Sequence, residues 1–206
     1  MKRHVNVLGV GMTQFKTPKN ADPYTVMGHE AGQLALADAG LDYRHVEQAY
    51  VGYVYGDSTA GQRVVYELGM TGIPVFNVNN NCATGSSALY LARQAVESGM
   101  VECAIALGFE QMQPGALVNI YNDRPSPLGK FIDLAKNKSG DSEVPMAPLL
   151  FGGAGREYME KYGCKPETFG RITVKARKHA QNNPKAVFRD LVTLEQVMQS
   201  PSICDP

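Results

Sequence analysis

Residues 77–87 read NVNNNCATGSS, and this stretch decides the predicted fold. The β-branched run at Val75–Asn79 is typical of a short strand, and a helical pattern begins directly after Cys82. A cysteine at such a junction faces the unpaired amides and the positive dipole end of the helix, which favour its thiolate form. A thiolate there can form a thioester, and the same amides could hold the oxyanion of an attacked acyl carbonyl.

The segment Cys82–Glu97 has small and apolar residues on every side, which predicts a helix buried between two layers. Gly85 and its two following serines would be poor choices for an exposed helix, since glycine costs about 1 kcal/mol there relative to alanine. Close packing of the backbone is the better reason for them. A plainer alternative for Cys82 stays open, because free cysteines are often small buried core residues.

Strand-like runs alternate with helix-length segments over the first half of the chain, which predicts a layered α/β sheet. The first helix is expected at Tyr24–Ala39, with Asp22 as its N-cap, Pro23 at its first position and Gly40 as its stop. The expected strands are His4–Val10, Gln48–Tyr55, Val75–Asn79 and Glu102–Gly108.

The pattern changes after Phe109, where Pro114–Pro148 is rich in Pro, Gly, Asn, Asp and Lys without sustained periodicity. We expect a long loop excursion here. Two helices should follow, at Ala154–Tyr162 and Pro166–Gln181. The predicted organisation is an α/β core at residues 1–113, then the excursion and helices of the same domain at residues 114–206.

The composition is that of an ordinary globular protein, with 206 residues of which 44% are hydrophobic. Twenty basic residues balance twenty acidic ones, so no global field would attract a nucleic acid or an anionic membrane. No apolar run approaches the roughly 20 residues of a membrane span. The four cysteines form no CxxC pair, which argues against a metal site and indicates a reducing compartment.

Three stretches together resemble the nucleophile segment of thiolases, and most closely that of the sterol-carrier-protein type. They are NNNCATGSSAL at residues 79–89, ARQAVESG at 92–99 and ECAIALGFEQM at 102–112. The resemblance extends over essentially the whole chain and implies that Cys82 is the catalytic nucleophile. It also implies a layered βαβαβαββ half-fold with a buried central helix and a long loop excursion. This half pairs with a second, similar half in an enzyme that is usually a dimer or a tetramer.

The same resemblance implies acyl-CoA and 3-oxoacyl-CoA thioesters as substrates, with no covalently bound cofactor and no metal. It places the activity in lipid metabolism, in fatty acid β-oxidation or near lipid transport. The compartment that it implies is the peroxisome, with the cytoplasm and the mitochondrion as alternatives. Phe151 and Gly152 fall in the excursion that lines the acyl tunnel of the family, so both are expected substrate contacts. The second-half histidine and cysteine of thiolases match no residue here, and structural or solvated roles are expected for the four histidines.

Several alternatives stay open. The chain could be a catalytically incomplete isoform that acts only in assembly, or a condensing enzyme similar to 3-oxoacyl synthases. Nucleotide binding at Gly9-Val10-Gly11 is disfavoured because Gln14 stands at the third glycine position. The basic run from Arg171 to His179 could meet the phosphates of CoA, although a solvated helix face is the better interpretation. An unpaired half should expose the apolar surface that its twin would cover.

Overall fold

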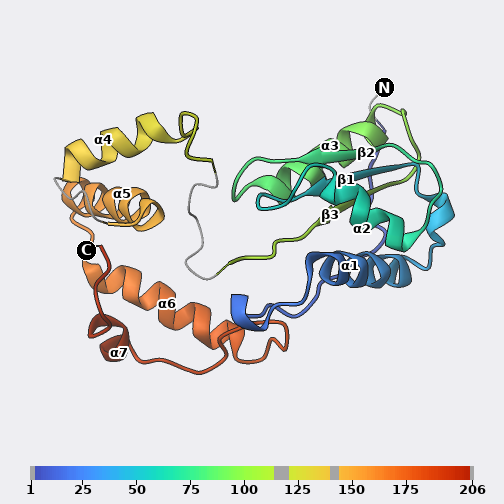
Figure 1. Ribbon diagram of the computed structural model, residues 1–206. Coiled ribbons are helices and arrows are strands. Elements are labelled where there is room, and N and C mark those ends of the chain that lie inside the picture. Colours follow the sequence, from blue (N-terminus) through green and yellow to red (C-terminus); the bar gives the residue numbers. More distant parts are fainter. Residues whose placement is uncertain (1–2, 114–120, 140–143, 205–206) are drawn as a thin grey trace. The chain divides into compact units, whose positions relative to one another are not determined.

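A computed structural model describes residues 3–113, 121–139 and 144–204. Its internal contacts divide into two compact units, Met1–Pro114 and Gly115–Pro206 (Figure 1). The first unit contains the sheet and the second is helical. No helix in the described ranges is both long and apolar enough to cross a membrane.

The sheet of the first unit has three parallel strands in the order β2-β1-β3. They are β1 (Gln48–Gly52), β2 (Val75–Val78) and β3 (Ala104–Gly108). Val51 in the central strand is paired with Asn77 on one side and Leu107 on the other. The layered α/β fold expected from the sequence is therefore confirmed, and three of its four expected strands form this sheet.

Helices cover both faces of the sheet (Figure 1). Alternate strand residues point to opposite faces, and apolar residues on each face pack against a helix. Val51 packs into one core with Val64 and Val65 of α2 (Ala60–Leu68), and residues of α1 (Tyr24–Ala39) pack against that core. Tyr50 packs into the other core, beneath α3 (Thr84–Glu97).

Helix α3 approaches the sheet through small residues. Ala88, Ala92 and Ala95 lie on one face at helical spacing and are buried. On the opposite face Leu89 and Tyr90 are 56% and 55% exposed. The expectation of a helix buried on every side is thus not met within this chain, whereas the expected exposed apolar surface is present.

Gly52 allows the N-terminus of α3 to lie close to the end of β1. A Cβ at Gly52 would stand 2.7 Å from Thr84 Cγ2 and 3.2 Å from the Thr84 carbonyl oxygen. We expect Gly52→Ala to lower the free energy of unfolding by about 1–3 kcal/mol, since overpacking forces the backbone to shift. Urea denaturation would measure the loss. Gly85→Ala, where nothing lies within 4 Å, is the matched control and should not destabilise; equal losses in both variants would contradict this prediction.

Residues 4–10 form no strand, contrary to the sequence-based expectation. Gly9 and Gly11 instead lie against the backbone of α1, where a Cβ at Gly9 would stand 2.4 Å from the Ala35 carbonyl oxygen. The amide of Val10 donates to the Asp38 carboxylate at 2.9 Å. These glycines therefore serve the packing of the chain on a helix, which also accounts for the motif that resembled a dinucleotide fingerprint.

Helix α1 has the predicted bounds and ends at Gly40, which adopts the left-handed conformation with φ of 64°. Its start differs from the prediction, since Pro23 occupies the N-cap and makes no side-chain cap. Asp22 forms an ion pair with Lys16 instead of capping the helix. Short 3-10 turns lie at Pro18–Asn20 and Tyr43–His45.

The second unit has four helices within its described ranges. They are α4 (Gly129–Ser139), α5 (Met146–Tyr162), α6 (Pro166–Ala180) and α7 (Leu194–Met198). The expected loop excursion is thus partly helical, since α4 lies inside it and α5 begins eight residues before the predicted start. Gly163 ends α5 and Pro166 begins α6 as predicted. Residues 114–120 and 140–143 of the excursion lie outside the described residues.

Candidate functional site

Cys82 lies in the short connection between β2 and α3, and it is the exposed one of the four cysteines. Asn81 just before it has a φ of 46°, a left-handed conformation that asparagine tolerates better than most residues. An isolated bridge joins Asn80 and Cys82. The strand-to-helix junction predicted from residues 77–87 is present, and it places the thiol at the surface.

Thr84, the first residue of α3, holds this connection in place. Its hydroxyl donates to the Asn81 carbonyl oxygen at 2.5 Å and accepts from the Asn80 amide at 2.8 Å. The side chain is 6% exposed, so few water molecules can replace these bonds. Thr84 thereby ties both residues before Cys82 to the buried start of the helix.

A second set of hydrogen bonds fastens the same connection one turn further along α3. The Asn80 side-chain amide donates to Ser87 Oγ at 3.0 Å, and the Ser87 hydroxyl donates to the Ala83 carbonyl oxygen at 3.0 Å. The Asn81 amide donates to Asn79 Oδ1 at 3.2 Å. The asparagines of the NNNC stretch thus act as local backbone supports.

The N-terminus of α3 leaves donors available beside Cys82. The amides of Thr84 and Ser87 donate to the carbonyl oxygens of Asn81 and Ala83. Between them lie the amides of Gly85 and Ser86, for which the described part of the chain offers no backbone acceptor. These N–H groups and the helix dipole favour negative charge at this end of α3, as a thiolate or an oxyanion requires.

Cys103 lies in a different electrostatic environment from Cys82. It is half-buried just before β3, and its amide donates to the Glu47 carboxylate at 3.1 Å. Burial, together with the charge of Glu47, raises the pKa of the Cys103 thiol. Cys103 is therefore held in the protonated form and packs against the core of the first unit.

The GFEQ sequence after β3 braces the neighbouring loops. The Glu110 carboxylate accepts from the amides of Val54 and Tyr55, at 2.9 and 3.0 Å, in the loop after β1. Gln111 Oε1 accepts from the amide of Tyr24 at the start of α1, at 3.0 Å. The ring of Phe109 stacks on that of Tyr53, with centroids 5.1 Å apart. The strand end thus fixes loops of the first unit.

We expect Glu110→Gln to destabilise the first unit by about 2 kcal/mol, because one of two backbone amides would lose its charged acceptor and face an NH₂ group. Thermal unfolding followed by circular dichroism would measure this change. Glu102→Gln is the matched control, since the Glu102 side chain is exposed and pairs with Arg3 at the surface. A Glu110 variant no less stable than this control would contradict the prediction.

The expected substrate contacts Phe151 and Gly152 lie on α5, in the second unit. Phe151 is 74% exposed, and a Cβ at Gly152 would stand 2.7 Å from Cys204 Sγ. A groove of about 490 Å³ lies between α4 and α5, lined by neighbouring residues that include Phe131, Leu134 and Leu150. Neither predicted contact lines that groove. Their role toward a substrate stays a prediction.

The part of the chain that the structure describes supplies no activating partner for Cys82. No hydrogen bond to its thiol is found there, and no group of His, Cys, Asp and Glu residues could hold a metal ion. His29 has a buried Nδ1 without a described partner, and His179 belongs to a groove on α6. The site therefore consists of a positioned, exposed thiol beside helix amides.

Sequence reasoning found Cys82 but missed the side chains that position it. The sequence pattern assigns no positioning role to Thr84, Ser87 or Glu110. The spacing of Asn80, Thr84 and Ser87 carries a signal, because residues four and seven positions apart lie along one side of a helical turn.

Comparisons with known proteins agree with this geometry. A family model described as "Thiolase, N-terminal domain" matches residues 5–203. Sterol carrier protein 2 from Gallus gallus is 52% identical over 207 residues, which cover 100% of this chain and 38% of the relative. The chain thus spans well under half the length of that relative.

Two solved structures share the fold. A human mitochondrial 3-ketoacyl-CoA thiolase, solved in complex with CoA, has a TM-score of 0.69 at 16% identity and covers 95% of this chain and 57% of its own. An Ltp2-ChsH2(DUF35) aldolase has a TM-score of 0.69 at 25% identity and covers 97% and 49%. With the family match over nearly the entire sequence, the chain belongs to the thiolase N-terminal domain family.

Proposed function

We propose that this chain is the nucleophile-bearing half of a thiolase-type acyl-CoA acyltransferase, with Cys82 as the residue that takes the acyl group. The observation that carries the proposal is the position of Cys82, exposed at the N-terminus of α3 on a connection fastened by Thr84. A thiol that is accessible, near helix amides and held by buried hydrogen bonds fits nucleophilic catalysis.

In the proposed step the Cys82 thiolate attacks the thioester carbonyl carbon of an acyl-CoA, or the 3-oxo carbonyl carbon of a 3-oxoacyl-CoA. The developing oxyanion is stabilised by the free amides at the start of α3. The bond from the carbonyl carbon to the leaving group then breaks, and an acyl-cysteine thioester remains. With acyl-CoA the leaving group is the CoA thiolate. With 3-oxoacyl-CoA the bond between C2 and C3 breaks, the shortened acyl group stays on Cys82, and the leaving group is the carbanion of acetyl-CoA, which takes a proton.

The complete cycle needs groups that this half does not bring to Cys82. A base must take the thiol proton, and an acid must protonate the carbanion. We propose that both come from the second thiolase half, and that the assembled enzyme is a dimer of such pairs. The peroxisome, with a role in lipid metabolism, is the proposed compartment because the resemblance to the sterol-carrier-protein type implies it.

Incubation of the purified chain with acetyl-CoA and with a short 3-oxoacyl-CoA tests the proposal. Intact-mass measurement should detect one added acyl group, and peptide mapping should locate it on the peptide that contains Cys82. An acyl group distributed over Cys164 and Cys204, which are only part-exposed, would indicate non-specific exchange with other thiols and would count against the proposal.

A second function, in assembly alone, is favoured by the apolar outer face of α3. Leu89, Tyr90 and Met100 are all more than half exposed there or directly after the helix. Apolar surface of this kind usually has a partner. A folded chain that takes no acyl group but associates in light scattering would support the assembly role, whereas a compact acylated monomer would oppose it.

A further inference from the structure

Gly85 is a glycine that the fold of this chain does not require. It lies in the first turn of α3, three residues after Cys82, and it is exposed. It is not among the residues with positive φ, so its backbone conformation is open to other residues. A Cβ at this position would meet no atom within 4 Å in the described part of the chain. The close packing that the sequence suggested for Gly85 is therefore not found there.

The other helical glycines of the first unit do have a packing reason. A Cβ at Gly28, Gly32 or Gly61 would stand less than 3.0 Å from an atom of a neighbouring element. Glycine weakens a helix relative to alanine, and close approach between elements offsets that loss. Gly85 weakens its helix without such an approach. The reason for a glycine at this position therefore lies in a group that the described chain does not contain.

A side chain at position 85 would lie beside the thiol of Cys82. In an α-helix the Cα–Cβ bond tilts toward the N-terminus, so each residue covers the turn that precedes it. For Gly85 that turn is the connection that carries Cys82. This connection is held close to the helix, since the Thr84 amide donates to the Asn81 carbonyl oxygen at 3.0 Å. The missing Cβ thus leaves space free next to the nucleophile.

The space beside Gly85 can hold an alkyl group. The Cys82 side chain is also exposed, and it stands more than 4 Å from the position of a Gly85 Cβ. Non-bonded carbon atoms touch at about 3.5–4.0 Å, so a methylene group can lie over the Gly85 backbone without a clash. A methyl group at position 85 would take up part of that space.

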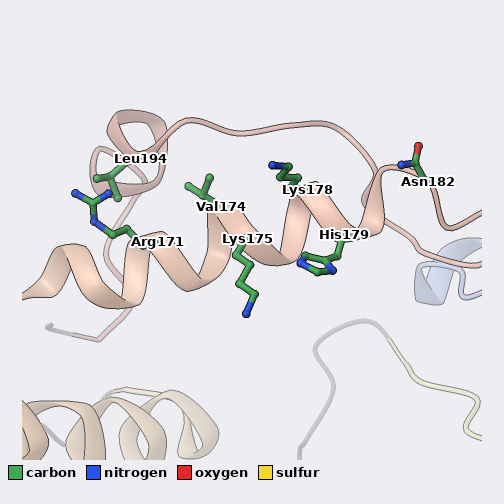
Figure 2. Close-up of a pocket in the computed structure, with 7 residues that line it drawn as sticks. All are labelled: Arg171, Val174, Lys175, Lys178, His179, Asn182 and Leu194. Carbon is green, nitrogen blue, oxygen red and sulfur yellow. The ribbon is translucent and has the colours of Figure 1, made fainter.

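The grooves of the second unit are built from other parts of the chain. One lies between α4 and α5, and the other follows α6, where Figure 2 shows its lining residues. All residues that line either groove belong to the second unit. Within the first unit, the residues that can limit a group bound to the thiol are therefore those beside Cys82.

We propose that Gly85 sets the size of the acyl group that Cys82 accepts. This inference rests on the acyl transfer proposed above, in which the carbonyl carbon becomes bonded to Cys82 Sγ and the CoA thiolate leaves. The acyl chain then starts next to Sγ and passes over the Gly85 backbone. A side chain at position 85 would collide with a longer chain, whereas an acetyl group ends in a single methyl group and needs less space.

Acylation rates with hexanoyl-CoA and acetyl-CoA, measured by intact mass, test the inference as a ratio. Gly85→Ala should lower the hexanoyl-to-acetyl ratio about tenfold and Gly85→Val about a hundredfold, since one carbon group in a binding site changes selectivity by about ten- to two-hundredfold. Helix propensity rises from glycine through valine to alanine. An effect of space is therefore larger in the valine variant, and an effect of helix stability is larger in the alanine variant.

Gly155→Ala is the matched control. Gly155 also lies in a helix, its Cβ position is 3.9 Å from Phe169, and it lines neither groove. A methyl group fits there at an ordinary contact distance. This variant should keep the ratio of the parent chain, because its helix gains alanine at a position away from α3.

Alkyl methanethiosulfonates probe the same space without acyl transfer. The Cys82 thiolate displaces methanesulfinate and forms a mixed disulfide, whose alkyl chain starts next to Sγ as an acyl chain does. Peptide mass mapping gives the hexyl-to-methyl rate ratio at Cys82, and the same ratio at Cys164 is the reference within each sample. The ratio at Cys82 should fall from the parent through Gly85→Ala to Gly85→Val.

A graded fall of both ratios, with the Gly155 control unchanged, supports the inference. Acylation of Cys82 with unchanged ratios in both Gly85 variants would overturn it and leave the proposed function intact; the glycine would then serve contact with the second half. A larger effect in the alanine variant than in the valine variant would also overturn it. A chain that takes no acyl group but shows the graded alkyl ratio would contradict the proposed function and still support the role of Gly85.

Discussion

A Cys82→Ser chain is expected to gain no acyl mass from acyl-CoA under conditions in which the parent chain gains one acyl group. A serine hydroxyl is a weak nucleophile without a positioned base, and no such base contacts residue 82 in the described part of the chain. The thiol needs less help, because a fraction of it is ionised near neutral pH and the helix amides favour that form. Intact-mass spectrometry over time measures the difference.

Two cysteine variants control for reaction at other thiols. Cys103→Ser should keep the parent's acylation, since burial and Glu47 hold that thiol protonated. Cys164→Ser should also keep it, because Cys164 is less exposed than Cys82 and its thiol donates to the Lys165 carbonyl oxygen at 3.7 Å. Acylation that persists in Cys82→Ser and disappears in either control would reject Cys82 as the nucleophile.

The core of the first unit could be predicted because its signals are local. Short apolar, strand-like runs predict β1 and β2, and the left-handed Gly40 ends α1 where glycine predicted it. The junction at Cys82 can be predicted because the apolar pattern changes within a few residues from the two-residue period of a strand to the 3.6-residue period of a helix. Each of these features depends on neighbours in the sequence, which a single sequence contains.

The failures come from particular contacts that a sequence pattern does not specify. Val7 and Val10 have strand propensity, but Gly9 and Gly11 allow their segment to lie against α1, and the sheet does not extend to it. Asp22 could cap α1 in isolation, yet its carboxylate pairs with Lys16. The apolar pattern of α3 predicts burial on every side, but the outer face is exposed because no described residue of this chain covers it.

In the candidate site too, local features could be predicted and particular side-chain contacts could not. A strand, a cysteine and a helix are readable in order, so Cys82 could be found. The bonds from Thr84 to the backbone of Asn80 and Asn81 depend on a left-handed residue at position 81, which sequence patterns do not specify. Likewise, the contact of Glu110 with the loop after β1 spans more than fifty residues.

Thr84→Val is expected to slow acylation of Cys82 by about a hundredfold while most of the secondary structure is kept. Valine has nearly the shape of threonine, so the buried packing against Gly52 survives, but the hydroxyl that bonds Asn80 and Asn81 is lost. The connection that carries Cys82 then loses its anchor to α3. Displacement of a reacting group by about 1 Å can cost a hundredfold in rate.

The stability of the same variant should fall by about 2 kcal/mol, because a part-buried backbone amide and carbonyl would lose their partner. Thr84→Ser restores the hydroxyl and is the matched control, which should recover most of the acylation rate. Time courses by intact mass, combined with urea denaturation of each variant, separate the two effects. A Thr84→Val chain that is destabilised but acylated at the parent rate would mean that Thr84 supports only the fold. Loss of rate in the valine variant and its recovery in the serine variant would instead assign the Thr84 hydroxyl to the positioning of the nucleophile.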